Sequence, residues 1–520
     1  MAPVDAVAPI HVAAPPVGVR PAPAGVVHPP GARRAATAQT AHLPIPALLL
    51  LAGLATGAAA QGGYHTAGQI GMAGFLGAAL VASVAASFSA RRPPWRILSA
   101  VPVPAAATLA AWAVVSGARA GDTRAALSIV GLLAGVAAVV IVCQALSGPQ
   151  RELLVSGAVA VGALVALTGW AGVAFRSAPW ALESSGLWRA ATTLTYANAA
   201  AGLLVPLALV AMAALCGAAL PKPPVTRPGL GRAPSPLLGA GAFVLTLGAV
   251  ATLSRFGFLT LCLGFAILAA LLGPGRLVRH AAAPVLGAGL ALATLLPSVP
   301  GDHPARPLLA AAGLLAGLLI AVAGPAPVGH LGEALGRRRA AVALVALGVV
   351  AAGTLAVLAP TLHAVSAVRL NLASPARTQS TQAALRLAAG HPLTGVGPGN
   401  AGLSWAGPGG SRLFSRYAHD EYLQTLAELG AIGAGLLLVL LVSAAGQVAR
   451  GRRLVPSRAL WAGAVAGLAA FALHSGADFL WHIPVIPLTA ALLIGITAPP
   501  RTTAVATPGG GSASPSNQEV

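Results

Sequence analysis

The sequence predicts an all-α, polytopic membrane protein, a bundle of about fourteen transmembrane helices with one long extracytoplasmic loop. Two observations predict this fold. The 520-residue chain is 57% hydrophobic and 8% charged, with a mean hydropathy of +0.82, whereas soluble domains carry about 25% charged residues. Its apolar residues also occur in runs of about 20, the length that crosses a bilayer core.

Apolar segments long enough to span a membrane cover most of the chain. Residues 43–362 are predicted to form a bundle of about eleven helices, and residues 423–499 three more. The segments 236–253 and 256–273 are separated only by the stretch around Ser254 and Arg255, so they form either a tight hairpin or one broken helix. The full set lies at 43–60, 68–90, 97–116, 125–146, 153–175, 197–220, 236–253, 256–273, 281–298, 306–323, 340–362, 423–447, 459–474 and 484–499.

The basic residues indicate how the helices are oriented. If the N-terminus is cytoplasmic, 20 of the 31 Lys and Arg residues fall in cytoplasmic segments, as the positive-inside rule expects. Residues 1–42 and 500–520 are then cytoplasmic tails, and their Pro-, Gly- and Ser-rich compositions predict disorder. The net charge of +20 is therefore interpreted as the topology signal of a multi-pass plasma (inner) membrane protein, with no nucleic-acid partner.

One predicted connection is much longer than the others. Residues 363–422 lie on the extracytoplasmic side in this topology. They contain a helix-like stretch at 377–389, followed by the Gly/Pro-rich turn GHPLTGVGPGNAG at 390–402. Long structured loops are more often functional than connective, so this loop is predicted to carry the site.

Two polar residues beside apolar spans have open interpretations. Arg255, in TLSRFGF, either snorkels or caps a helix, or it contacts an anion at the outer membrane face. Asn198, in TLTYANAAAGL, begins an apolar span and either caps the helix or binds a polar ligand.

A basic group precedes the next span. If residues 411–433 are helical, Arg412, Arg416 and His419 share one face. Two guanidiniums suit a phosphate or diphosphate, and a histidine beside them could accept a proton. The alternative is a solvated basic helix face. Glu428 is a further proton-acceptor candidate, as are Asp420 and Glu421, which equally suit a helix N-terminus.

A third group of polar residues ends the next apolar segment. His474, Asp478 and His482, in LHSGADFLWHIP, have the i, i+4, i+8 spacing of one helix face and could hold a metal ion. The stretch reaches a helix end and lacks a clear fourth ligand, and a His–Asp hydrogen bond explains the spacing equally well. We therefore predict no metal site.

Together these stretches resemble the O-antigen ligase and polymerase family of bacterial envelope glycan enzymes, which also includes protein O-oligosaccharyltransferases. The resemblance covers residues 190–490. HPLTGVGPGNAG (391–402) is similar to the family's "hPltGvGxGnf" turn, and HDEYLQTLAELGAIG (419–433) is similar to its "HNxyLxxLxExGxxG" signature. LSRFGF (253–258) is similar to its "SRgg" segment. The order of these motifs, with the long loop ending in the histidine motif, carries the resemblance.

The resemblance implies a membrane glycosyltransferase that needs neither metal nor cofactor and inverts the sugar. Its donor would be a glycan on an undecaprenyl-diphosphate carrier, and its acceptor a hydroxyl of a glycan, lipid or protein. Arg255 matches the family's functional arginine, and His419 matches the histidine proposed to activate the acceptor or position the donor. Either Arg412 or Arg416 would match the loop arginine, and Asn198 and Glu428 are expected to assist substrate binding.

Two other functions compete with this interpretation. A transporter or flippase of lipid-linked glycans would carry charged residues in mid-span and paired broken helices at the midplane, whereas the spans here are almost free of charge. The related cell-wall polymerase family of shape and division proteins is the second rival, and activity on the peptidoglycan precursor would favour it.

Overall fold

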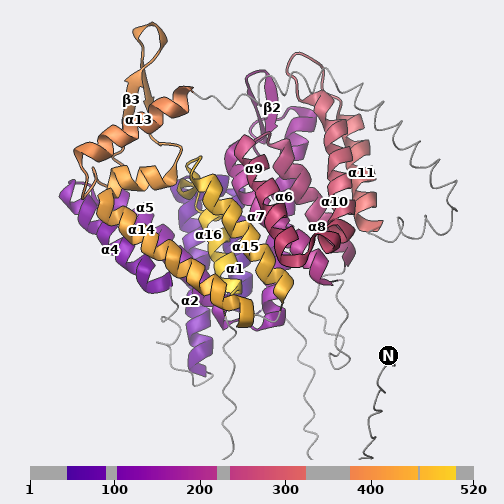
Figure 1. The fold of residues 1–520 in the computed structure, drawn as a ribbon, viewed down its shortest axis with the longest axis horizontal. Coiled ribbons are helices and arrows are strands. Elements are labelled where there is room, and N and C mark those ends of the chain that lie inside the picture. Colours follow the sequence, from indigo (N-terminus) through magenta and orange to yellow (C-terminus); the bar gives the residue numbers. More distant parts are fainter. Residues whose placement is uncertain (1–43, 90–101, 219–234, 324–374, 455–456, 499–520) are drawn as a thin grey trace, which may run out of the picture. The chain divides into compact units, whose positions relative to one another are not determined.

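The computed structural model describes residues 44–89, 102–218, 235–323, 375–454 and 457–498 (Figure 1). They belong to one compact unit that begins at Ala41. The described part of the chain is mostly helical, with two antiparallel β-hairpins that the hydropathy pattern did not predict. The elements are α1 (Ile45–Ala59), η1 (Gln61–Gly63), α2 (Thr66–Ser89), α4 (Pro102–Arg119), α5 (Thr123–Ala145), α6 (Gly148–Phe175), β1 (Ala181–Ser184), β2 (Leu187–Ala190), α7 (Ala197–Ala218), α8 (Ser235–Ala251), α9 (Arg255–Leu272), α10 (Pro274–Leu295), η2 (Leu296–Ser298), α11 (Pro307–Ala323), α13 (Pro375–Gly390), β3 (Leu403–Ala406), η3 (Pro408–Gly410), β4 (Arg412–Ser415), α14 (Glu421–Leu454), α15 (Arg458–Ser475), η4 (Leu480–His482) and α16 (Val485–Ile496).

Many of these helices have the length and composition of membrane spans. Within the described residues, seven of them (α2, α5, α6, α7, α9, α10 and α14) are long and apolar enough to cross a bilayer, and α1, α8, α11 and α16 are apolar but shorter. The predicted span 340–362 and the predicted tails 1–42 and 500–520 lie outside the described residues. The helical membrane-type architecture is therefore confirmed, and the number of spans stays a prediction.

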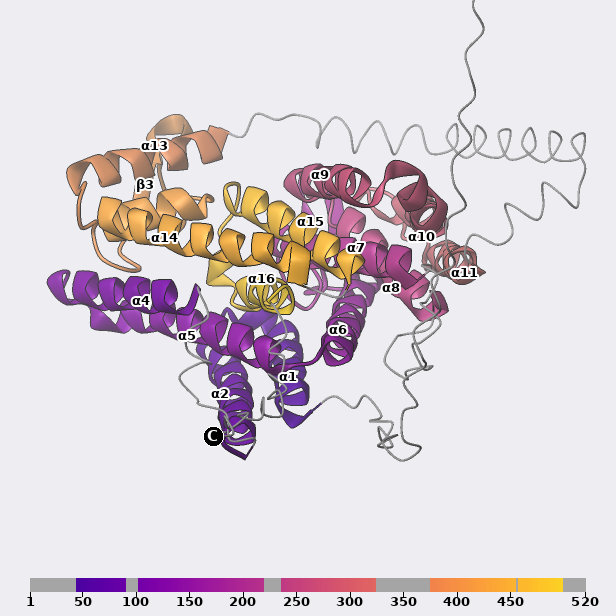
Figure 2. The ribbon, with the colours of Figure 1, turned by 60° about the horizontal axis from the view of Figure 1, so that its bottom comes forward.

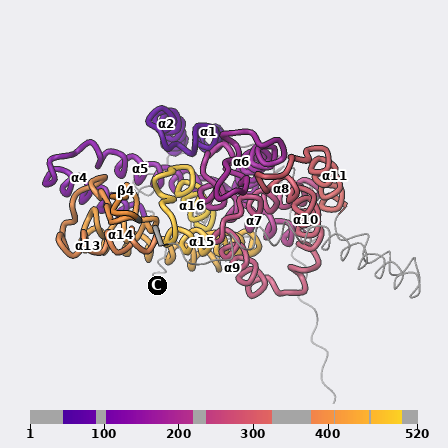
Figure 3. Tube along the Cα trace, turned by 90° about the horizontal axis from the view of Figure 1, so that it is seen from above, coloured from indigo at the N-terminus to yellow at the C-terminus, as the bar shows by residue number. Residues whose placement is uncertain are grey.

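Helix α7 lies at the centre of the bundle, between α6, α8, α9, α15 and α16 (Figures 2 and 3). In its most apolar 18-residue stretch, 94% of the helix is buried inside the protein. Glycines of α15 allow this close packing: a Cβ added at Gly463 would lie 2.8 Å from Cβ of Ala213, and one at Gly467 would lie 3.2 Å from the Pro206 carbonyl oxygen. Small residues at such contacts let helix backbones approach closely where lipid is the solvent.

The structure distinguishes between the two interpretations of residues 236–273. Helix α8 ends at Ala251 and α9 begins at Arg255, with Leu253 in the left-handed region (φ 49°) between them. The Ser254 hydroxyl accepts the Gly257 amide at 3.2 Å and caps α9. These are consequently two helices joined by a tight turn, and Arg255 is the first residue of the second.

Connections that the predicted topology places on the extracytoplasmic side contact one another. Tyr64 Oη, after α1, lies 3.1 Å from Tyr417 Oη, before α14. The Ser116 hydroxyl at the end of α4 donates to the Thr394 carbonyl at 3.1 Å. The β1–β2 hairpin also pairs with the connection between α10 and α11. These contacts agree with the predicted alternation of sides, while the side that faces the cytoplasm stays a prediction.

The Gly/Pro-rich turn at 391–400 fills a break in α14. Helical geometry fails at Gly430 (φ 66°, ψ −171°), and a Cβ there would overlap the Leu393 carbonyl. Likewise, a Cβ at Gly395 would overlap the backbone of Glu428. The turn satisfies the backbone groups that the break leaves unpaired, through Val396 N–Ala427 O, Gly397 N–Glu428 O, Ala431 N–Pro392 O and Ile432 N–Leu393 O. The two glycine-containing motifs thus form one unit that anchors the long loop on α14.

Candidate active site

A buried carboxylate, Asp478, lies in the turn between α15 and η4, and its side chain is 1% exposed. Tyr196 Oη lies 2.8 and 2.9 Å from its two oxygens, and Asn198 Nδ2 donates at 2.5 Å. Arg377 Nη2 donates at 3.1 Å, and His419 Nδ1 lies 3.0 Å from Oδ1. Residues from four separate chain segments therefore meet at one carboxylate.

Two members of this cluster come from the long loop. Arg377 lies in the first turn of α13, and the buried Ser380 hydroxyl of the same helix lies 3.4 Å from the Ala418 carbonyl. His419 adopts left-handed backbone geometry (φ 55°). Asp420 then accepts two backbone amides of the first turn of α14, which is the helix-capping role that its sequence position suggested. These local contacts bring the guanidinium and the imidazole to the same carboxylate.

Asp478 is a carboxylate in this setting. Burial alone would raise its pKa, but the hydrogen bond from His419 and the positive charge of Arg377 outweigh burial, so that the pKa lies below its ordinary value. A carboxylate only accepts hydrogen bonds, so the proton of a neutral His419 is on Nδ1. Nε2 then keeps a free lone pair, on a side chain that is 29% exposed. Burial and the neighbouring Asp478 also raise the pKa of Tyr196, which stays a donor.

The Asn198 side chain is engaged inside the cluster. Its Nδ2 donates to Asp478 and lies 3.0 Å from Tyr196 Oη. Its Oδ1 accepts from Arg189 Nη2, on β2, at 3.0 Å. The Nε of this arginine donates to the Thr252 carbonyl at 2.9 Å. Arg189 therefore orients the amide toward Asp478 and connects it to the turn before Arg255.

Arg255 lies at the N-terminus of α9, directly after its Ser254 cap. Its side chain is half-buried. The next residue, Phe256, stacks at 6.4 Å on His474, which is four residues before Asp478. A guanidinium and a helix N-terminus both attract anions. Arg255 therefore lies on an element that packs beside the Asp478 cluster, at a position suited to negative charge.

The expectation of one helix face for Arg412, Arg416 and His419 was wrong. Arg412 begins strand β4, which pairs with β3 through Ala406, and Arg416 follows that strand. Both arginine side chains are exposed. The helix starts only at Glu421 because the glycines between 407 and 410 turn the chain back into a hairpin, so residues 412–415 find strand partners before the helix begins.

Glu428 lies apart from the Asp478 carboxylate. It is buried in α14 at 6% exposure and accepts a hydrogen bond from Gln424 Nε2 at 2.6 Å. Gln424 Oε1 in turn accepts the Ala418 amide at 2.8 Å. Glu428 therefore supports the segment that carries His419, and its proposed contact with substrate stays a prediction.

The shared helix face of His474, Asp478 and His482 was also wrong. Helix α15 ends at Ser475, Asp478 lies in the following turn, and His482 belongs to η4. The alternative explanation, a His–Asp hydrogen bond, does apply to Asp478, but its partner is His419. Among the described residues, no group of three or more His, Cys, Asp or Glu side chains is arranged to hold a metal ion.

Three members of the cluster were missed by the sequence reasoning: Arg377, Tyr196 and Arg189. Arg377 is the first residue of the helix that was predicted at 377–389, and Tyr196 belongs to the TYANAAAGL stretch. Their positions in these two segments were the sequence signal that could have identified them. Arg377 is an arginine of the long loop that contacts the cluster, and the expected contact of Arg412 or Arg416 with the diphosphate stays a prediction.

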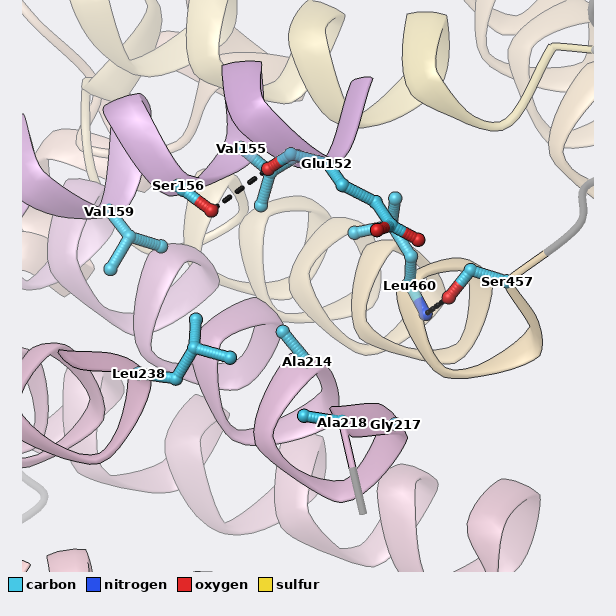
Figure 4. A pocket seen from close by; sticks show the side chains of 10 residues that line it. All are labelled: Glu152, Val155, Ser156, Val159, Ala214, Gly217, Ala218, Leu238, Ser457 and Leu460. Carbon is cyan, nitrogen blue, oxygen red and sulfur yellow. Dashed lines mark hydrogen bonds between the residues drawn. The ribbon is translucent and has the colours of Figure 1, made fainter. Parts of the chain in front are cut away.

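A separate cleft lies at the ends of α7 and α15 that are opposite to the Asp478 cluster. It measures about 510 Å³ including its open mouth and is lined by Glu152, Ser156, Leu238 and Ser457, among others (Figure 4). These residues come from the start of α6, α8 and α15, whereas Asp478 follows the end of α15. The cleft therefore contributes nothing to the Asp478 cluster.

Comparison with known proteins agrees with the motif analysis. Residues 306–438 match the family model described as O-Antigen ligase. The matched region includes Arg377 and His419, while Asn198, Arg255 and Asp478 lie outside it. No curated protein matches the chain. Within a membrane-type helix bundle, the chain therefore contains a region, residues 306–438, that is similar to the O-antigen ligase family.

Proposed function

We propose that the protein transfers a glycan from an undecaprenyl-diphosphate carrier to an acceptor hydroxyl at the extracytoplasmic face of the plasma membrane. The observation that carries this proposal is the junction of His419 and Arg377 on Asp478, at 3.0 and 3.1 Å. Glycan transfer from a diphosphate to a hydroxyl requires an oriented base that takes the hydroxyl proton. It also requires a fixed positive charge, here a guanidinium, that stabilises the departing diphosphate. The family match supports the same class of reaction.

In this mechanism His419 acts as the general base. Its Nε2 accepts the proton of the acceptor hydroxyl while the hydroxyl oxygen forms a bond to the anomeric carbon. The bond between that carbon and the diphosphate oxygen breaks on the opposite face, so the sugar is inverted. Asp478 holds the imidazole in the required tautomer and stabilises the imidazolium that forms, as the buried aspartate does in hydrolytic triads.

The arginines are proposed to bind the departing diphosphate. Arg377 is held by Asp478 yet remains 33% exposed, so it can contact an anion and the carboxylate together. Arg255 would contribute the second guanidinium from α9. Charge that is already in place when the diphosphate departs lowers the barrier without reorganisation. The proposed chemistry uses no metal and no cofactor.

The alternative function, a flippase of lipid-linked glycans, is less well supported. Such a protein would need charged side chains along a path through the bundle. Among the described residues, the buried charged side chains lie near helix ends or in turns: Arg151, Glu421, Glu428 and Asp478. This distribution favours chemistry at one membrane surface.

A deletion strain tests the proposal. It would be complemented with wild type, Arg377→Ala, His419→Ala or Arg255→Ala at matched membrane levels. Arg386→Ala is the matched control, because Arg386 is an exposed arginine on the same helix as Arg377. Surface glycans and carrier-linked intermediates would be read by gel and mass spectrometry.

We expect the deletion to deplete one glycan and to leave its carrier-linked precursor on the extracytoplasmic side. Only wild type and Arg386→Ala should restore the glycan. Full rescue by Arg377→Ala and His419→Ala would refute the catalytic assignment. Accumulation of the precursor on the cytoplasmic side would support the flippase instead.

A further inference from the structure

Exposed arginines gather at the face of the bundle that lies opposite the two β-hairpins (Figure 1). Helices α9 and α14 end at this face, and α10 and α15 begin there. The arginines of these four helix ends are all exposed, and we call them the arginine patch: Arg276, Arg279, Arg450, Arg452, Arg453 and Arg458. The patch is separate from the Asp478 cluster, which lies at the other ends of α9 and α15.

The arginine patch joins two connections that are far apart in the sequence. Arg458 Nη2, at the start of α15, lies 3.5 Å from the Leu271 carbonyl oxygen near the end of α9, across 187 positions. Trp461 Nε1 donates to the Val448 carbonyl at 2.8 Å and holds the start of α15 against the end of α14. The positive-inside rule explains why each connection is basic, but it does not require the two connections to meet. Their convergence is a property of the tertiary structure.

The positive charge of the patch is not balanced within the part of the chain that the structure describes. The ion pairs among the described residues involve other arginines and histidines, and none includes a member of the patch. At this face, the described residues contain one carboxylate, Glu152 at the start of α6, which lines the cleft of Figure 4. Six guanidiniums thus face one carboxylate. Like charges repel, so an anion held among these arginines would relieve the repulsion.

The position of the patch indicates which kind of anion it fits. Helices α9, α10 and α14 have the length and composition of membrane spans, so their ends lie at the level of the lipid headgroups. Arg276 and Arg279 are three residues apart on α10, as are Arg450 and Arg453 on α14, so each pair shares a helix face. Guanidiniums bind phosphate oxygens through several hydrogen bonds at once. Basic sites between spans bind anionic lipid headgroups in this way.

We propose that the arginine patch binds an anionic phospholipid of the leaflet that borders this face. The phosphate of the lipid is held between the α9–α10 connection and the α14–α15 connection, and it ties the two together. Helix α9 begins with Arg255, and α15 leads into the turn that holds Asp478. The bound lipid therefore braces two helices whose other ends carry the candidate active site. The inference concerns binding alone and does not depend on the proposed transferase function.

Thermal unfolding and native mass spectrometry of the purified, delipidated full-length protein test the inference. The probes are phosphatidylglycerol, which is anionic, phosphatidylcholine, which has no net charge, and inorganic phosphate. Two double variants each change one connection: Arg276→Gln with Arg279→Gln, and Arg452→Gln with Arg453→Gln. The control combines Arg124→Gln with Arg306→Gln, because these two exposed arginines precede or begin helices at the opposite face.

We expect phosphatidylglycerol to raise the unfolding temperature of wild type and of the control, and phosphatidylcholine to raise it much less. An arginine near an anionic headgroup is worth about 5-fold in affinity, so each double variant should bind phosphatidylglycerol about 25-fold more weakly. The unfolding temperature without lipid should match wild type in every variant, which separates lost binding from lost folding.

Several results would overturn the inference. Equal stabilisation of wild type by the two lipids would mean that charge is not recognised. Wild-type affinity for phosphatidylglycerol in both double variants would remove the arginine patch from the site. An equal loss of affinity in the control would show that only the net charge of the protein matters. Full stabilisation by inorganic phosphate would make the patch a site for a free anion and not for a lipid.

Discussion

Replacing Asp478 by asparagine tests the centre of the proposed site. The Oδ1 of Asp478 accepts from His419, and Oδ2 accepts from Arg377 and Asn198. All of these partners donate hydrogen bonds. The side-chain nitrogen of the asparagine is also a donor, so in either orientation of the amide it faces donors and cannot accept from them. At least two buried hydrogen-bonding groups then lose their partner, at about 1–3 kcal/mol each. We expect Asp478→Asn to lower the free energy of unfolding by about 2–6 kcal/mol.

The same substitution removes the group that fixes the tautomer of His419. General-base catalysis contributes about 10²–10⁴-fold to rate, so kcat for transfer should fall by about that factor. The assay is glycan transfer by purified protein, at a temperature where circular dichroism shows both proteins folded, together with a thermal unfolding curve. Because the folded fraction is matched, any fall in rate reports on the site.

Asp302→Asn is the control for this experiment. Asp302 is an exposed aspartate whose partner is also a histidine, His303, at 2.9 Å. It should leave the unfolding temperature and the rate unchanged. If folded Asp478→Asn transfers glycan within about twofold of wild type, the assignment of His419 as an oriented base is wrong.

Three further predictions concern stability and pH, each read from thermal unfolding of purified protein. Arg151→Met should lower the free energy of unfolding by about 2–6 kcal/mol, because the buried guanidinium donates to carbonyls at the ends of α5 and α16; exposed Arg124→Met should not. Gly430→Ala should cost about 1–3 kcal/mol from its φ of 66° alone, whereas Gly435→Ala, where the added Cβ meets open space, should be neutral or stabilising. The pKa of folded Asp478 lies below its ordinary value of 3.8, so its charge contributes stability fully above that value and loses it as the pH falls through the lower folded pKa. The difference between wild type and Asp478→Asn should then persist at mildly acidic pH and shrink in strong acid; a difference that shrinks as the pH rises would contradict this.

Hydropathy predicted most helices well because a helix that crosses the bilayer core needs a run of about 20 apolar residues, and such runs are visible in the sequence. The segment 459–474 corresponds to α15, from Arg458 to Ser475, and 306–323 corresponds to α11. The segment 281–298 was placed too late, since α10 already begins at Pro274. Its first turns carry the exposed Arg276 and Arg279, which lower the local hydropathy without opposing the helix.

The loop was harder to predict because its structure depends on pairing between distant residues. The 411–420 stretch has helical spacing of its basic residues, yet it forms a strand because 403–406 lies alongside it. The motif glycines were recognised as a turn, but only the tertiary structure shows that Gly395 and Gly430 fill the same break in α14. A hydropathy profile holds no information on such pairing.

By itself, the sequence predicted a membrane-type helical protein that resembles the O-antigen ligase family, with His419 at the end of its long loop as a candidate base. Apolar runs and local motifs carry that information within single segments. The tertiary structure decided which charges meet. It placed Arg377 and His419 on Asp478, the latter across 59 positions, and it used Arg151 to cap two helices. The physical reason is that a buried charge is stable only beside its partners, and those partners come from segments that only folding brings together.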